Sequence, residues 1–285
     1  MSGRGIPYST VRRCFNAAAF TLTGVFAAVT VSTLFFILGF ITWHGISAVN
    51  VDFFIHLPKP VGEPGGGMAN AIVGTGKLLL LASAIGVPIG FFAGVYLSEF
   101  GHNKLGFWVR YAADLLNGVP SIVMGIFAYT LIVLPMKQFS TFAGGVALGI
   151  MMIPIAVRST EEFLKLVPNS VREAAYALGV HEWKTIVFVV IPAAIRGLLT
   201  GILLDIARVA GETAPLLFTA FNNRVWSHGW MEPTSSLPVM IFTYAIAPYD
   251  DWHRQAWAGA LVLMFLLLLV NGGTRLLLPR RRVVT

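Results

Sequence analysis

Six long apolar runs constrain the fold of this chain more than any other feature of its sequence. A helix that crosses a bilayer needs about 20 mostly apolar residues. The runs cover roughly Phe15–Trp43, Leu78–Leu97, Val119–Pro135, Phe142–Val157, Ile186–Phe221 and Ala256–Leu278. Only 12% of the 285 residues are charged, whereas soluble domains carry about 25%. We therefore predict an all-α polytopic membrane protein with six transmembrane helices.

Basic residues at the ends of these runs predict how the chain is oriented. If the N-terminus is cytoplasmic, most of the 20 lysines and arginines fall in cytoplasmic segments, as the positive-inside rule requires. We therefore expect both termini in the cytoplasm. The formal net charge of +7 then reflects membrane topology and contact with lipid, so no nucleic acid partner is expected.

The longest predicted cytoplasmic loop, from about Ser159 to Thr185, contains a helical pattern. Ser170 and Glu173 have the spacing of a capping box, and Gly179 suits the end of a helix. Apolar side chains recur at helical spacing at Val171, Ala174, Ala175 and Leu178. We predict a short amphipathic helix, which is marginal alone in water. It must therefore dock against the chain's own spans or against a partner.

The same loop resembles the EAA loop of ABC-type importer permeases, whose pattern is EAA-x3-G-x9-I-x-L-P. Glu173-Ala174-Ala175, Gly179 and Pro192 fit this spacing, with Val189 and Ile191 as aliphatic replacements. In that family the loop is a coupling helix that sits in a groove of an ATPase subunit. The resemblance implies that ATPase coupling involves Glu173, Ala174, Ala175, Leu178 and Gly179. The capping box is an alternative explanation of Glu173.

A stripe of small and charged residues is predicted on one face of the fifth run. Its members are Gly197, Gly201, Asp205, Arg208 and Glu212, with separations of 4, 4, 3 and 4 residues. A charge at the centre of a membrane helix costs about 2.5 to 3.5 kcal/mol, so these groups should face protein or water.

Two interpretations of the stripe are open. Arg208 and Glu212 could form an ion pair that locks two helices, while Gly197 and Gly201 allow tight packing. Alternatively, Arg208 presents a fork of donors to a passing oxyanion, and Glu212 limits how strongly the anion is held.

A second pair of charges, Arg158 and Glu161, lies three residues apart at the inner end of the fourth run. These side chains could line the cytoplasmic mouth of a pathway. They could equally be ordinary charges at the membrane interface.

Three segments resemble one family of permeases in particular. They are Pro154–Glu161, Leu166–Ala175 and Ala207–Leu217. All three are similar to the A-type permease of the high-affinity phosphate ABC importer, the PstA family, and the similarity extends over nearly everything from about Gly65 onward. This resemblance implies the type I ABC importer permease (MetI-like) fold. We therefore expect the substrate pathway to include Arg208, Glu212, Arg158, Glu161 and Asp205.

The resemblance also implies a domain organisation and a location. Residues 1–14 would be a cytoplasmic N-terminal segment, and residues 15–64 the first transmembrane helix with an external loop. Residues 65–279 would form the ABC transmembrane permease domain, with the EAA coupling loop at about 159–192. Residues 280–285 would be a basic cytoplasmic tail. The expected location is the bacterial plasma (inner) membrane.

The implied partners are a homologous C-type permease, an ABC ATPase dimer and an external phosphate-binding protein. ATP and magnesium would be used by the ATPase, and we expect no cofactor, metal or catalytic residue in this chain. Gly74-Thr75-Gly76-Lys77 is not a phosphate-binding loop, because Ala71 replaces its first glycine and Leu78 follows the lysine. The chain should therefore be a permease subunit without an ATPase site of its own.

Other functions stay open at this point. The transported anion could be sulfate or molybdate, since an arginine in a span does not distinguish oxyanions. An ion-coupled secondary anion transporter could use Glu212, Asp205 and Arg208, but it predicts inverted repeats that the sequence does not show. A membrane-embedded enzyme would need clustered histidines or carboxylates within the spans, and the six histidines lack the spacing of metal ligands.

Overall fold

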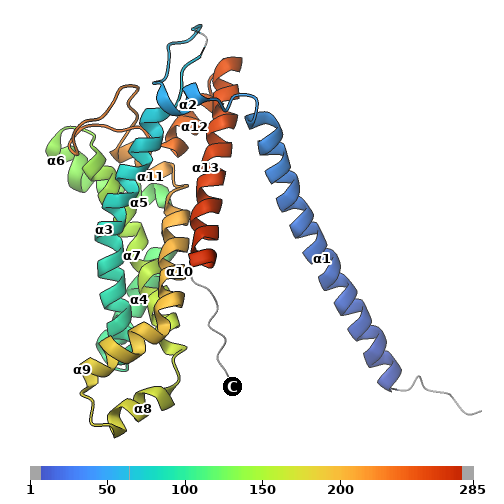
Figure 1. Ribbon diagram of the computed structural model, residues 1–285, viewed down its shortest axis with the longest axis vertical. Coiled ribbons are helices and arrows are strands. Elements are labelled where there is room, and N and C mark those ends of the chain that lie inside the picture. The colour runs from blue at the N-terminus through green and yellow to red at the C-terminus, as the bar shows by residue number, and fades with distance from the viewer. Residues whose placement is uncertain (1–7, 64, 278–285) are drawn as a thin grey trace, which may run out of the picture.

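The computed structural model describes residues 8–63 and 65–277, and helices form the regular structure of that part of the chain (Figure 1). The predicted basic tail, residues 280–285, lies outside the described residues. The α-helices are α1 (Tyr8–Gly45), α2 (Val51–Ile55), α3 (Ala69–Glu99), α4 (Lys104–Gly118), α5 (Ser121–Ala128), α6 (Leu134–Met136), α7 (Thr141–Lys165), α8 (Asn169–Ala177), α9 (Glu182–Thr185), α10 (Ile191–Val209), α11 (Ala214–Thr219), α12 (Leu237–Ala245) and α13 (Asp250–Leu277). Two π-helical turns, η1 (Tyr129–Val133) and η2 (Ile186–Val190), join α5 to α6 and α9 to α10.

The described residues contain five helices long and apolar enough to cross a membrane. They are Phe15–Gly45, Ala69–Glu99, Thr141–Lys165, Glu182–Val209 and Asp250–Gly272. Lys104–Gly118 and Ser121–Met136 pass the same test together, with a bend of 102° between them. If this bent pair is one broken span, the described residues hold six, which agrees with the predicted fold class.

The predicted start of the third span at Val119 is wrong. A separate helix, α4, precedes that position, and the chain bends between Gly118 and Ser121. Val119 is extended, with φ −73° and ψ 129°, because the ring of Pro120 disfavours a helical conformation in the preceding residue. Hydropathy alone missed α4 because this helix carries polar and charged side chains.

The fifth span was predicted to continue to Phe221, and this is also wrong. Helix α10 ends at Val209, and α11 begins a new helix at Ala214. Pro215 lies in the first turn of α11, where a backbone N–H would have no partner within the helix. In the interior of one continuous helix the same proline would break the hydrogen bonding. Glu212 therefore lies in the break between two helices.

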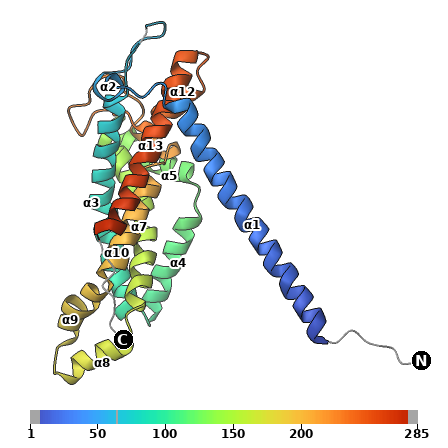
Figure 2. The ribbon, with the colours of Figure 1, turned by 45° about the vertical axis from the view of Figure 1, so that its right-hand side comes forward.

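The long helices form a bundle from which α1 diverges. Helices α3, α7 and α10 run along its length, α8 lies at one end, and α2 and α12 lie at the other end (Figure 1). Both views show α1 leaving the bundle at a wide angle (Figure 2). It approaches α13 closely at Gly45, where an added Cβ would lie 2.7 Å from the carbonyl oxygen of Trp257.

A stripe of glycines brings α3 close to α7. A Cβ added at Gly86 would lie 2.6 Å from the Met152 Cβ and 2.8 Å from the Gly149 oxygen. Gly90 and Gly94, one and two turns further along, meet Ala156 and Thr160 of α7 in the same way. Small residues at this spacing let two membrane helices approach through their backbones.

The Gly86→Ala substitution is therefore expected to destabilise the bundle by about 1–3 kcal/mol, because the added methyl overpacks the contact between α3 and α7. Thermal unfolding of the purified protein in detergent measures this loss. Gly76→Ala is the matched control, since Gly76 lies in the same helix and its added Cβ meets nothing within 4 Å. Equal unfolding temperatures for the two variants would contradict the close packing.

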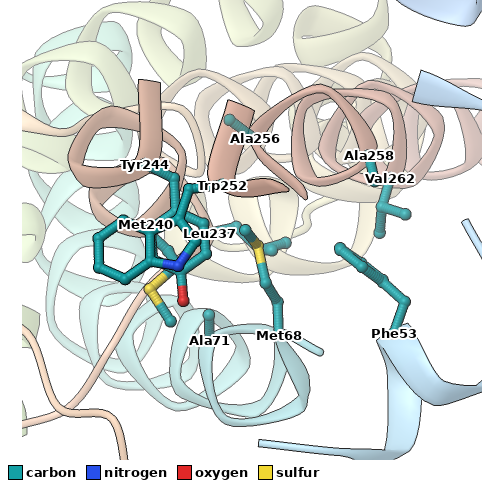
Figure 3. Packing of buried hydrophobic residues seen from close by; sticks show 10 residues of the cluster. All are labelled: Phe53, Met68, Ala71, Leu237, Met240, Tyr244, Trp252, Ala256, Ala258 and Val262. Atoms are coloured by element: carbon teal, nitrogen blue, oxygen red, sulfur yellow. The ribbon is translucent and has the colours of Figure 1, made fainter. Parts of the chain in front are cut away.

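At the end opposite α8, a hydrophobic cluster joins four helices. It contains Phe53, Met68, Ala71, Leu237, Met240, Tyr244, Trp252, Ala256, Ala258 and Val262 (Figure 3). The rings of Tyr244 and Trp252 stack with centroids 4.5 Å apart. The loop before α12 is tied to α3, because Lys77 Nζ donates to the Ser227 carbonyl at 2.5 Å. Lys77 belongs to helix α3, as do Gly74, Thr75 and Gly76.

Candidate functional site

Arg208 and Glu212 line a common cavity. Arg208 lies in the last turn of α10, and Glu212 lies in the break that follows. The cavity has a volume of about 20 Å³ and is also lined by Leu116, Asn117, Val119, Met124, Met151, Ile155 and Val209. This space has room for little more than one water molecule. The structure thus brings together two of the five predicted pathway residues at the bend between α4 and α5.

Of the two interpretations of the stripe, the structure does not support the ion pair between Arg208 and Glu212. None of the ion pairs among the described residues includes Arg208, whose side chain is exposed. The helical spacing that suggested the pair ends at Val209, and the backbone of Glu212 turns back to donate to the Val209 carbonyl at 3.1 Å. The guanidinium group of Arg208 therefore lies open beside the cavity.

Asp205 does not join the lining of this cavity. It is 1% exposed, and neither of its carboxylate oxygens has a hydrogen-bond partner. Its face of α10 packs on α7, where a Cβ added at Gly201 would lie 3.0 Å from the Ser159 Cβ. Gly197 similarly faces Phe163, which confirms the tight packing predicted for the two glycines.

Arg158 and Glu161 belong to a larger group that we call the α4–α7 charge cluster. Its members are Arg110 and Asp114 of α4 and Arg158, Glu161 and Lys165 of α7. Glu161, which is 1% exposed, accepts from Arg110 Nε at 2.7 Å and Lys165 Nζ at 2.5 Å. Its second oxygen lies 3.5 Å from Arg158 Nη1.

The pair Arg158 and Glu161 is thus part of a larger cluster, and the sequence analysis did not find its partners on α4, Arg110 and Asp114. Arg158 is also paired with Asp114 through two of its nitrogens. The available signal was that Arg110 and Asp114 lie one turn apart, as do Glu161 and Lys165. The cluster has three basic and two acidic side chains, and the exposed carboxylate of Glu162 also interacts electrostatically with Arg158.

The Glu161→Ala substitution is expected to lower stability by about 1.5–3 kcal/mol, because it removes the buried carboxylate that accepts hydrogen bonds from Arg110 and Lys165, whose charged groups stay partly exposed to water. The yield and unfolding temperature of the purified protein measure this effect. Glu162→Ala is the matched control, since Glu162 is the exposed neighbouring acid on the same helix. Equal stability of both variants would show that Glu161 does not hold the cluster together.

The predicted amphipathic helix of the loop is confirmed as α8. Ala175 is buried, whereas Glu173, Ala174 and Leu178 are exposed, Leu178 at 84%. Gly179 has φ +77°, and its N–H donates to the Tyr176 carbonyl at 2.9 Å. The predicted coupling residues therefore form an outward face at the end of the bundle, apart from Ala175, which packs inward (Figure 1).

The capping box predicted at the start of this helix is wrong. Helix α8 begins directly after Pro168 and has no hydrogen bond from a capping side chain. Proline fixes the backbone where the helix begins, so the motif is not needed there. The identity of Glu173 is therefore not explained by capping, and its exposed carboxylate is available to a partner.

Comparison with known proteins identifies the family of the chain. Residues 86–283 match the family of binding-protein-dependent transport system inner membrane components. The phosphate transport system permease protein PstA of Yersinia pestis is 43% identical over 261 residues, covering 89% of this chain and 88% of the relative. The chain belongs to the PstA family. The PstA protein of Xylella fastidiosa is 44% identical over 274 residues and is covered, like this chain, to 95%.

Solved structures confirm the fold expected for a PstA-family chain. The inward-facing MetNI methionine ABC transporter has a TM-score of 0.60 at 18% identity, covering 74% of this chain and 95% of that chain. An amino acid ABC transporter has a TM-score of 0.53 at 19% identity, with coverage of 73% and 90%. The PstA-family chain therefore has the MetI-like permease fold, and these two likenesses bear on fold alone.

Proposed function

We propose that this chain is one of two permease subunits of an ATP-driven importer that moves inorganic phosphate into the bacterial cytoplasm. The observation that carries the proposal is the 44% identity, across 95% of the chain, to a permease named for phosphate transport. The open guanidinium of Arg208 supports it, because a planar fork of donors suits the oxygens of a phosphate group. The small cavity beside Arg208 would widen when the helices around it move.

The partners in this proposal are a homologous C-type permease, an ABC ATPase dimer and an external phosphate-binding protein. ATP and magnesium belong to the ATPase. The family description, which specifies dependence on a binding protein, supports the external partner. The exposed face of α8 supports the ATPase partner. In this arrangement α8 and both termini are cytoplasmic, in the plasma membrane.

Transport would proceed by alternating access. ATP binding closes the ATPase dimer, α8 moves with it, and the bundle opens outward to receive phosphate. Arg208 then binds phosphate oxygens, and the nearby carboxylate of Glu212 limits how strongly the anion is held. After hydrolysis the bundle opens inward, and the arginines and lysine of the α4–α7 charge cluster line the cytoplasmic exit.

Reconstitution in liposomes tests this function. Liposomes that contain both permeases and the ATPase, supplied with binding protein outside and ATP inside, should take up labelled inorganic phosphate. Uptake should stop when the ATPase is omitted. Uptake that continues without the ATPase would contradict the proposal and favour an ion-coupled anion transporter. Competition by excess sulfate or molybdate would assign the pathway to a different oxyanion.

A further inference from the structure

A single guanidinium group, that of Arg172, connects three helices at the α8 end of the bundle. Arg172 belongs to α8, and its Nη2 and Nε donate to the two carboxylate oxygens of Glu99 on α3, at 2.9 and 3.2 Å. Its Nη1 donates to the Val167 carbonyl at 2.5 Å, and Nη2 also reaches the Leu164 carbonyl at 3.1 Å. Leu164 belongs to the last turn of α7, and Val167 lies in the short segment between α7 and α8. Arg172 thus joins α8 to α3 and α7.

This ion pair differs from ordinary surface pairs. The side chains of Arg172 and Glu99 are only 14% and 7% exposed, although α8 lies at the surface of the molecule. Exposed pairs hold position weakly because water screens them and their side chains stay mobile. A bidentate, largely buried contact fixes both the distance and the angle between the guanidinium and the carboxylate.

The pair is a main connection between α8 and α3. The backbone of α8 packs chiefly against α9 and η2, which lead into α10. Besides Arg172, its neighbour Val171 packs on the hydrophobic cluster that also receives Phe91 and Val95 of α3. Side chains in an apolar contact can shift past one another, whereas the bidentate ion pair has one geometry. A movement of α8 is therefore transmitted to α3 most directly through Arg172 and Glu99.

A second arginine also contacts the C-terminal end of α3. Arg110 of α4 donates to the carbonyls of Leu97 and Gly101, at 2.9 and 2.8 Å, and to Glu161 at 2.7 Å. The C-terminal end of α3 is therefore bonded to both α8 and α4. Leu116 and Asn117, in the last turn of α4, line the cavity beside Arg208. The contacts form a continuous series from the coupling helix to that cavity.

We infer that Arg172 is a positioning residue that transmits the movement of α8 to α3 through Glu99, separately from the residues that hold the ATPase. This inference rests on the proposed function, because it needs an ATPase partner that moves α8. It assigns attachment to the exposed face of α8 and transmission to the opposite, buried face. The two roles are then separable by substitution.

The test measures phosphate imported per ATP hydrolysed by the reconstituted transporter. For Arg172→Ala and for Glu99→Ala, this ratio should fall by about tenfold, a usual size for coupling between two sites, while the amount of ATPase bound to the permeases is unchanged. The double variant should lose no more than either single variant, because both remove the same connection. Arg172→Lys should keep part of the ratio, since it retains the charge without the fork.

Lys104→Ala is the matched control, because Lys104 is an exposed base near the same end of α3 and forms none of the ion pairs among the described residues. An unchanged ratio in both single variants overturns the inference. Loss of bound ATPase in these variants also overturns it, because Arg172 would then shape the docking face. Failure of the unaltered chain to bind an ATPase would instead overturn the proposed function.

Discussion

Replacement of Arg208 by alanine is expected to reduce phosphate uptake by about 100-fold while the transporter still assembles. Arg208 lines the cavity between α4, α7 and α10 and makes no ion pair with another described residue, so its removal breaks no structural contact of that kind. A hydrogen bond to a charged group contributes about 1.5 to 3 kcal/mol, which corresponds to about 10- to 150-fold in affinity. Initial uptake rates in reconstituted liposomes measure this loss.

One further variant separates the geometry of the Arg208 guanidinium from its charge, and a second serves as a control. Arg208→Lys should recover little uptake, because an ammonium group cannot make two parallel hydrogen bonds to one phosphate. Arg196→Ala is the matched control, since Arg196 lies on the same helix but does not line the cavity. Normal uptake by the Arg208→Ala variant would show that this arginine has no part in binding the anion.

The presence of several membrane spans was predictable because hydropathy measures the transfer of a whole helix into lipid. The breaks within spans were not, since they depend on single residues inside apolar runs. The bend at Pro120 and the end of α10 at Val209 are of this kind. The fifth run is predominantly apolar on both sides of the break, up to Ala210 and again from Ala214 to Phe221, so hydropathy cannot detect where its helix stops.

The candidate site was predictable where its signals are local. Helix α8 and its end at Gly179 follow from residues within one short segment, and the structure confirms both. The contacts of Glu161 with Arg110 and of Arg172 with Glu99 join residues 51 and 73 positions apart. No periodicity within one helix can reveal such pairs. Helical spacing also suggested the pair between Arg208 and Glu212. It did so because the spacing assumes one continuous helix, whereas α10 ends at Val209, before Glu212.

Gly179→Pro is expected to release the ATPase from the permease. The backbone at Gly179 has φ +77°, and its N–H donates to the Tyr176 carbonyl. Proline fixes φ near −65° and has no N–H, so the last turn of α8 must rearrange. The exposed face that includes Leu178 then loses its shape. Co-purification of the ATPase with the tagged permease, in detergent at low salt, measures the loss.

Glu173→Lys tests the same face without changing the backbone. Glu173 is exposed, and α8 has no capping hydrogen bond that depends on it, so this variant should fold normally and still bind less ATPase. Gly179→Ala should have an intermediate effect, because a residue with a Cβ tolerates positive φ at a cost of about 1–2 kcal/mol. Retention of the ATPase by both Gly179→Pro and Glu173→Lys would mean that α8 serves only its own bundle. A graded loss from Gly179→Ala to Gly179→Pro would instead tie attachment to the shape of this one turn.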